Sequence, residues 1–200
     1  MTVRGGVLLL LLLLLSGLHA CAGLPRLVVL HDPLTPEEHV TLGSSYEAQG
    51  LRDLAAQEYH AALRRQTEYV PALVGLGNLS FASGALQEAE DYYRQALDVE
   101  PKHPGAGNNL AMVYLARGAQ LDEAERLATS AAGQDGAVRP YALDTLAQIY
   151  IRQGRYREAR RTLDEAEAMV SPHNQILRDR LAQSRQELAA ASSQRNKEDN

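Results

Sequence analysis

Three side chains near the start of the chain are of types that bind metal ions: His31, Asp32 and His39. Imidazole and carboxylate groups are zinc ligands, but a metal site needs several of them to converge in one place. These three straddle a proline-rich segment and the start of a predicted helix. We therefore interpret them as part of a solvated loop, and the sequence predicts no metal and no other cofactor.

No arrangement of nucleophile and base marks this chain as an enzyme. No Ser/His/Asp or Cys/His set stands in a recognisable catalytic motif. The glycine pairs in the stretches GLGNLS and GAGNN do not follow a strand, as the glycines of a phosphate-binding loop do. The sequence therefore indicates a protein that is not an enzyme, and no small-molecule substrate is expected.

The charge balance argues against a nucleic-acid-binding protein. The chain has 20 Lys and Arg residues against 25 Asp and Glu residues, a formal net charge of −5, whereas nucleic-acid-binding domains usually carry a basic surplus. The densest basic stretch is RQGRYREARR at 152–161. We interpret it as a polar outer face, and the alternative is a dock for an acidic polymer or protein.

The first twenty residues have the pattern of a secretory signal peptide. Arg4 precedes an unbroken apolar run from Val7 to Leu15, and small residues follow. The run is too short to span a bilayer, which takes about 20 apolar residues. Cys21, the only cysteine of the chain, stands at the end of this segment. A single cysteine can form neither an internal disulfide nor a thiolate metal cluster, so its position needs another reason.

The stretch Leu18-His19-Ala20-Cys21 resembles a bacterial lipobox, in which the cysteine becomes the lipidated first residue of the mature chain. The resemblance implies a lipoprotein signal peptide over 1–20 and a lipidated tether over 21–35, with acyl chains such as palmitate on Cys21. Two or more acyl chains hold a protein stably at a membrane. By the same resemblance, Ala22 favours the outer membrane, with the protein facing the periplasm. The alternative is an ordinary signal peptide cut close to an incidental cysteine.

From residue 36 onward the sequence repeats itself with a period of 34 residues. The stretch LGSSYEAQG aligns with LGNLSFASG, and two further copies follow, with one residue inserted in the third. Each copy has apolar residues at helical spacing, a glycine and a second helical run. The copies carry a turn glycine at Gly50, Gly84, Gly118 and Gly154. This pattern of Leu-Gly or Leu-Ala, Tyr, Gly and Ala resembles the tetratricopeptide repeat (TPR) family over about 36–171.

The resemblance implies an all-α fold, a right-handed TPR solenoid of about four helix-turn-helix repeats. The expected repeats are 36–69, 70–103, 104–139 and 140–171. The glycines supply the backbone freedom that a tight turn between helices needs. Small residues mark where the two helices of a repeat cross closely, namely Ala55, Ala89, Ala124 and Ala159. Because a single hairpin cannot bury its apolar face, the repeats must stack.

Both ends of the array carry helix-start signals. Thr35, Pro36 and Glu38 predict a helix with a capping box. Ser171-Pro172 predicts the start of a C-terminal capping helix over 172–191, followed by a frayed polar tail over 192–200. The apolar stripe of this last helix is Ile176, Leu177, Leu181 and Leu188. An array of repeats needs such an end helix with one solvent-facing side.

TPR proteins generally bind peptides in the groove lined by the first helix of each repeat. Transferring the groove positions of the family to this chain predicts a peptide-binding groove made by Asn78, Phe81, Asn108, Met112, Leu115, Tyr141, Asp144 and Gln148. An asparagine offers a donor and an acceptor, which suit a peptide backbone. Where the Hsp70/Hsp90 type of TPR clamps a terminal carboxylate, only Asn109 fits, so that function is not supported.

These features together predict a membrane-anchored TPR adaptor of the bacterial cell envelope. We expect it to hold an extended segment or a helix of another envelope protein. Resemblance to bacterial TPR lipoproteins implies a scaffold role in assembling a secretion, pilus or polysaccharide-export machine. The alternative function is an accessory subunit of an envelope enzyme, such as a peptidase or a polysaccharide synthase.

Overall fold

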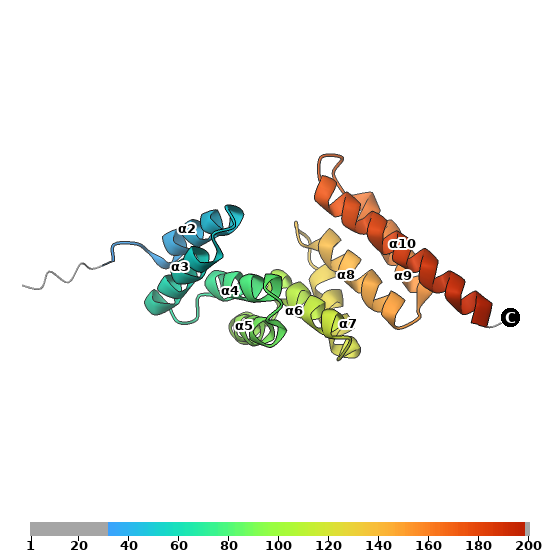
Figure 1. Ribbon diagram of the computed structural model, residues 1–200, viewed down its shortest axis with the longest axis horizontal. Helices are drawn as coiled ribbons and strands as arrows, with labels where there is room; N and C mark the ends of the chain where they lie inside the picture. The colour runs from blue at the N-terminus through green and yellow to red at the C-terminus, as the bar shows by residue number, and fades with distance from the viewer. Residues whose placement is uncertain (1–31, 199–200) are drawn as a thin grey trace, which may run out of the picture. The chain divides into compact units, whose positions relative to one another are not determined.

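The computed structural model describes residues 32–198, and every regular element within that range is an α-helix. The chain from Leu34 onward forms one compact unit. Its helices are α2 (Pro36–Ala48), α3 (Arg52–Arg65), α4 (Val70–Ala82), α5 (Leu86–Val99), α6 (Pro104–Arg117), α7 (Leu121–Ala132), α8 (Arg139–Arg152), α9 (Tyr156–Met169) and α10 (Gln175–Glu198) (Figure 1). The predicted signal peptide and Cys21 lie outside the described residues.

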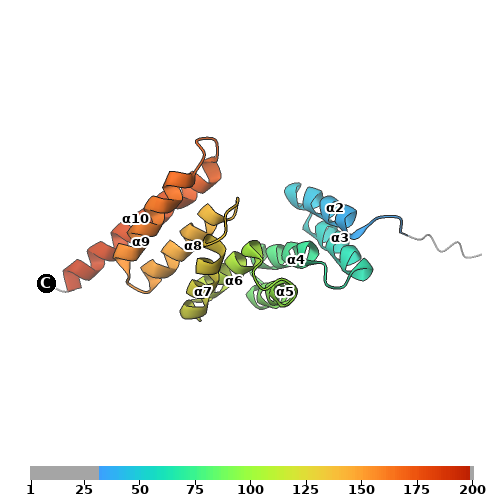
Figure 2. The ribbon, with the colours of Figure 1, turned by 180° about the vertical axis from the view of Figure 1, so that it is seen from behind.

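The helices pack as four hairpins, α2–α3, α4–α5, α6–α7 and α8–α9, and each hairpin stacks on the next in chain order (Figures 1 and 2). The helices α4, α6 and α8 each carry a proline in the first turn, where the N–H that proline lacks would have no partner inside the helix. This arrangement confirms the predicted all-α solenoid of helix-turn-helix repeats.

The N-terminus of the solenoid is capped as the sequence predicts. The Thr35 side chain accepts a hydrogen bond from the backbone N–H of Glu38 at 3.2 Å. In return, the Glu38 carboxylate accepts one from the backbone N–H of Thr35 at 2.8 Å, which completes a capping box. These bonds lower the pKa of Glu38, since the ionised carboxylate is the better acceptor.

The turn inside each hairpin depends on a glycine with positive φ. The φ angles of Gly50, Gly84, Gly118 and Gly154 are +76°, +80°, +62° and +73°, a region that strains residues with a Cβ. The prediction that these glycines form the turns is therefore confirmed. The extra residue of the third repeat lengthens the α6–α7 turn, where Gln120 has a φ of +55°.

The closest packing in the first two hairpins is between an aromatic ring and glycines. Tyr59 of α3 lies between Gly43 of α2 and Gly75 of α4. A Cβ on Gly43 would stand 2.7 Å from Tyr59 Cε1, and a Cβ on Gly75 would stand 2.6 Å from Tyr59 Cζ. The ring therefore contacts both its own hairpin and the next one, and it fixes how the two hairpins stack.

The second hairpin makes a similar contact. Tyr93 of α5 is buried, and a Cβ on Gly77 of α4 would stand 2.5 Å from Tyr93 Cε1. The Tyr93 hydroxyl donates a hydrogen bond to Asn78 Oδ1 at 2.9 Å. The ring cannot retreat from a larger residue at position 77 without loss of this bond. Elsewhere the helices cross on the predicted alanines, Ala55, Ala89, Ala124 and Ala159, all of which are fully buried.

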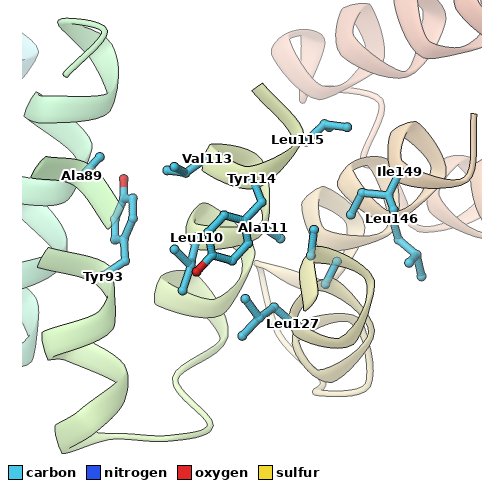
Figure 3. Packing of buried hydrophobic residues seen from close by; sticks show 12 residues of the cluster. Ala89, Tyr93, Leu110, Ala111, Val113, Tyr114, Leu115, Leu127, Leu146 and Ile149 are labelled. Carbon is cyan, nitrogen blue, oxygen red and sulfur yellow. The ribbon is translucent and has the colours of Figure 1, made fainter. Parts of the chain in front are cut away.

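One buried cluster runs from the second hairpin to the fourth (Figure 3). Its residues are Ala89, Tyr93, Leu110, Ala111, Val113, Tyr114, Leu115, Ala124, Leu127, Ala128, Leu146 and Ile149. At its edge the Tyr114 hydroxyl donates to Glu90 at 3.2 Å and accepts from Arg94 at 2.9 Å. Arg117 also pairs with Glu90. The buried Glu90 carboxylate is thereby compensated, and it ties α6 to the preceding hairpin.

The C-terminal helix begins later than predicted. The residue that caps it is Asn174, whose Oδ1 accepts a hydrogen bond from the backbone N–H of Leu177 at 3.1 Å. Ser171 and Pro172 belong to the turn before α10. Asparagine is among the strongest N-cap residues, which explains why the helix starts here. The helix then continues through the stretch predicted to be a frayed tail and reaches Glu198.

The buried stripe of α10 is narrower than predicted. Leu177, Leu181 and Leu188 are buried against the fourth hairpin, and both views show α10 running beside α8 and α9 (Figures 1 and 2). Ile176 is 75% exposed, so the prediction that it belongs to the buried stripe was wrong. Successive helical residues are turned by about 100°, which takes position 176 away from the face that carries Leu177.

We expect Gly77→Ala to destabilise the protein by about 1–3 kcal/mol, because the new methyl group overpacks against the Tyr93 ring. This loss should exceed the gain of about 1 kcal/mol that alanine normally has over glycine inside a helix. Chemical denaturation followed by circular dichroism measures the difference. Gly107→Ala is the matched control, because its Cβ would meet only the Leu127 carbonyl oxygen, at 3.7 Å. If both variants are equally stabilised, the contact between ring and glycine does not constrain the stacking.

We expect removal of residues 172–200 to lower the free energy of unfolding by several kcal/mol. The truncation uncovers the face of the fourth hairpin on which Leu177, Leu181 and Leu188 pack, and each buried leucine is worth about 1.5–3 kcal/mol. Urea unfolding of the truncated and full chains gives the comparison. An unchanged unfolding curve would mean that α10 does not serve as a cap.

Candidate functional site

The first helices of the second, third and fourth hairpins border a pocket of about 500 Å³. The residues that line it are Asn78, Phe81, Tyr93, Gly105, Asn108, Asn109, Met112, Ala137, Val138, Tyr141 and Arg180. They come from α4, α5, α6, α8, the loop before α8, and the C-terminal helix α10. Five of the eight residues predicted to form the groove, Asn78, Phe81, Asn108, Met112 and Tyr141, thus lie around one pocket.

The wall of this pocket is mainly apolar. Phe81, Met112, Val138 and Tyr141 are all partly buried there. Ligand pockets in proteins typically have volumes of about 300–1,000 Å³ and combine apolar walls with a few oriented polar groups. Both the volume and the composition of this pocket agree with that description. Apolar side chains of a bound segment therefore have a surface on which to pack.

Two asparagines and a tyrosine form a closed hydrogen-bond set at one side of the pocket. Asn78 Oδ1 accepts from the Tyr93 hydroxyl at 2.9 Å and from Asn109 Nδ2 at 2.8 Å. Burial raises the pKa of the Tyr93 hydroxyl well above its usual value, so this group remains a neutral donor. The side-chain carbonyl of Asn78 is therefore already satisfied within the protein.

Asn108 is different, because half of its amide group has no partner. Its Nδ2 donates to Asn109 Oδ1 at 3.2 Å and lies 3.7 Å from Met112 Sδ. Its Oδ1 is buried and makes no hydrogen bond within the described part of the chain, and the residue is only 4% exposed. A buried polar atom without a partner costs about 1–3 kcal/mol. Asn108 Oδ1 is thus an unsatisfied acceptor on a residue that lines the pocket, and a ligand N–H would reach it after a shift of the neighbouring side chains.

The structure places Asp144 and Gln148 outside this pocket. Asp144 is fully buried under α10, where its Oδ1 accepts from the Ser184 hydroxyl at 2.6 Å. Its Oδ2 accepts from Gln148 Nε2 at 3.0 Å and from Arg180 Nη2 at 3.0 Å. The C-terminal helix therefore covers Asp144, and Gln148 donates to Ser184 Oγ of that helix at 3.2 Å. The prediction that Asp144 is open to a ligand is wrong, because α10 packs over it, whereas Gln148 stays partly exposed and is hydrogen-bonded to Asp144 and Ser184.

Leu115 also lies away from the pocket. It is 8% exposed and belongs to the buried cluster that joins the second, third and fourth hairpins (Figure 3). The next hairpin stacks closely enough on α6 to remove this side chain from solvent. Leu115 thus contributes to packing between hairpins.

Sequence reasoning missed Arg180, which α10 brings to the pocket. Its guanidinium carbon lies 5.9 Å from the centre of the Tyr141 ring, and its side chain is 33% exposed. One signal was present in the sequence: Arg180 lies three residues after Leu177 and one before Leu181, so it borders the buried stripe of the helix. Which surface of the repeats this stripe packs against could be seen only in the structure.

The basic stretch at 152–161 is partly internal to the structure. Arg155 pairs with Glu125 at 2.7 Å and with Glu158 at 3.1 Å, and its guanidinium lies 4.2 Å from the centre of the Tyr150 ring. Burial alone would raise the pKa of Glu125, but hydrogen bonds from Arg155 and Gln153 together lower it. Arg155 therefore joins the third and fourth hairpins and is not simply a surface charge.

Of the three side chains considered as metal ligands, His39 does not lie in a solvated loop as predicted. His39 is 2% exposed, and its Nδ1 lies 2.8 Å from Glu58 Oε2. It belongs to α2, and its carboxylate partner comes from α3, so the pair links the two helices of the first hairpin. Asp32 is exposed, and His31 lies outside the described residues. Across residues 32–198 no group of three or more His, Cys, Asp or Glu side chains is placed to hold a metal ion.

No helix among the described residues is both long enough and apolar enough to cross a membrane.

Comparison with known proteins gives similar chains over parts of this sequence. The photosystem I assembly protein Ycf3 of Cyanophora paradoxa is 36% identical over 84 residues, which are 40% of this chain and 49% of that protein. Ycf3 of Rippkaea orientalis is 30% identical over 89 residues, 42% of this chain and 50% of that protein. The chain thus spans about half the length of these curated relatives.

Solved structures agree with the fold. A thermophilic TPR protein of Thermus thermophilus has a TM-score of 0.64 and 23% identity, with 76% of this chain and 82% of that chain covered. Pseudomonas aeruginosa pilF has a TM-score of 0.59 and 20% identity, with 82% of this chain and 76% of that chain covered. At this level of identity the likeness concerns the fold.

A family model described as tetratricopeptide repeat matches residues 40–106 and 145–191, and a second one with the same description matches 80–143. The first match alone covers more than half of the chain. It includes three of the glycine turns and the ring contacts described above. On this sequence match and on the geometry of its hairpins, the chain belongs to the tetratricopeptide repeat family.

Proposed function

We propose that this protein is a membrane-anchored TPR adaptor that binds an extended segment of another envelope protein in the pocket between α4, α6 and α8. The observation that carries the proposal is the unpartnered Oδ1 of Asn108 beside an apolar wall. A peptide backbone supplies N–H donors at regular intervals, and its side chains can pack on the wall. A helix offers fewer free N–H groups, so the pocket favours an extended ligand.

An assembly role fits this kind of binding. An adaptor that holds a segment of a client protein can keep it in position while other subunits are added. Both curated relatives named above are photosystem I assembly proteins, and this supports an assembly role for this chain. For this chain we propose a secretion, pilus or polysaccharide-export machine as the assembly, because the N-terminal pattern points to the bacterial envelope.

We expect Asn108→Ala combined with Met112→Ala to weaken partner binding about tenfold or more, on the order of 1.4 kcal/mol. The change removes the free acceptor and part of the apolar wall, and circular dichroism should stay helical because neither residue holds hairpins together. A photo-crosslinking amino acid at Ala137, an exposed residue of the pocket rim, reports binding in envelope membranes. The same crosslinker at exposed Ala119 is the matched control.

The double variant should reduce adducts at Ala137 and leave those at Ala119 unchanged. Reversal of the exposed Arg157 and Arg160 to glutamate tests the outer face of the fourth hairpin. If these reversals abolish crosslinking while the pocket variant does not, the partner binds the outer face and the proposal fails.

The membrane anchor is a separate part of the proposal and rests on Cys21. We expect Cys21→Ser to release the protein from membranes, since lipidation at this residue would be lost and acyl chains provide the anchoring. Cell fractionation measures the release, and circular dichroism should show unchanged helix content. Mass spectrometry of the mature wild-type N-terminus should find an acylated cysteine. An unmodified Cys21 within the chain, or a mature chain that starts after it, contradicts the anchor.

A further inference from the structure

The charge in the pocket comes from outside the repeats. Among the residues that line the pocket in the described part of the chain, Arg180 alone carries a formal charge. None of these lining residues is a carboxylate, and the nearby Asp144 is fully buried. A ligand with an acidic group would therefore meet a cation at this end of the pocket and no exposed anion among the lining residues.

Two of the three guanidinium nitrogens of Arg180 form hydrogen bonds within the described part of the chain. Its Nε and Nη2 donate to Asp144 Oδ2 at 3.3 and 3.0 Å, and Nη1 makes no hydrogen bond among residues 32–198. A guanidinium has five N–H donors in a rigid planar fork, so one arginine can hold two carboxylates on different edges. The side chain is 33% exposed and lines the pocket.

Asp144 holds this fork in place. Its carboxylate accepts hydrogen bonds from Ser184 and Gln148 in addition to Arg180, so its own charge is well compensated. The guanidinium also stands against the Tyr141 ring. Because the buried carboxylate and the ring orient Arg180 before any ligand arrives, little side-chain entropy is lost when a second carboxylate binds.

From these contacts we infer that the pocket selects an extended peptide segment with an Asp or Glu side chain beside an apolar residue. The acidic side chain pairs with the open edge of Arg180, the apolar one packs on Met112 and Val138, and a backbone N–H donates to Asn108 Oδ1. This inference rests on the proposed function of the pocket. It adds the chemistry of the partner, and it assigns Arg180 of the capping helix as the residue that sets specificity.

The test uses display selection of peptides against the purified full chain. The peptides are embedded between fixed flanking sequences, so that none has a free terminal carboxylate. Selected sequences are synthesised with both ends blocked, each paired with an analogue in which the acidic residue is changed to its amide. Fluorescence anisotropy then gives the affinity of each pair. We expect the amide analogue to bind about tenfold more weakly, as for loss of one charge-assisted hydrogen-bonded pair.

Variants of Arg180 and Asp144 test whether Arg180 is the cation that binds the acidic side chain of the peptide. Arg180→Gln alone would strand the buried Asp144 charge, so the informative variant is Arg180→Gln with Asp144→Asn, which should bind the acidic and amide peptides equally. Arg178→Gln is the matched control on the exposed side of α10 and should change neither affinity.

The outcomes separate this inference from the proposed function. If no selected peptide loses affinity with Asn108→Ala and Met112→Ala, the pocket is not the binding site and both fail. If selected peptides depend on these two residues but bind equally well in acidic and amide forms, the inference about Arg180 fails and the proposed function stands. A preference for acidic peptides that persists without Arg180 would assign it to another cation and also overturn the inference.

Discussion

The rest of the structure depends on the contact between an aromatic ring and the backbone of neighbouring glycines. Tyr59 touches Gly43 in its own hairpin and Gly75 in the next, so one side chain sets both the crossing inside a repeat and the step to the following repeat. Protein interiors are close-packed, and a single added methyl group at such a contact has nowhere to go. The positions of the first helices α2 and α4, and with them the pocket residues Asn78 and Phe81 of α4, follow from this packing.

Buried carboxylates make the second kind of link between hairpins. The buried Glu90 and Asp144 and the partly buried Glu125 each accept bonds from an arginine of a different element of the fold. Such ion pairs contribute little net stability, because desolvation of the charges offsets much of their attraction, but a carboxylate without its partner is costly. Their main effect here is to favour a single packing arrangement between the two elements that each pair joins. The pair of Asp144 with Arg180 fixes the position of α10 along α8.

The C-terminal helix consequently has two roles. It buries the open face of the last hairpin through its leucines, and it covers groove positions that a simple series of repeats would leave open. The remaining pocket keeps five of the eight predicted groove residues. Its lining combines the asparagine set around Asn78 and Asn108 with a cation that no repeat contributes.

The sequence by itself determined the class of fold, the repeat length, the turn glycines and the crossing alanines. These features are local, since helical periodicity and glycine at positive φ depend on neighbours within one hairpin. The capping box at Thr35 was predictable for the same reason. The resemblance to the TPR family also placed Asn78, Phe81, Asn108, Met112 and Tyr141 among the groove positions of the first helices.

Only the tertiary structure decided which of those positions remain open. Leu115 is enclosed by the stacking of the next hairpin, and Asp144 is enclosed by a helix that lies 36 residues further along the chain at Arg180. The free acceptor of Asn108 likewise follows from the side chains packed around it. Burial and hydrogen-bond pairing depend on contacts between distant segments, and no local pattern specifies them. The helices could therefore be predicted from the sequence, but which of the groove positions stay open could not.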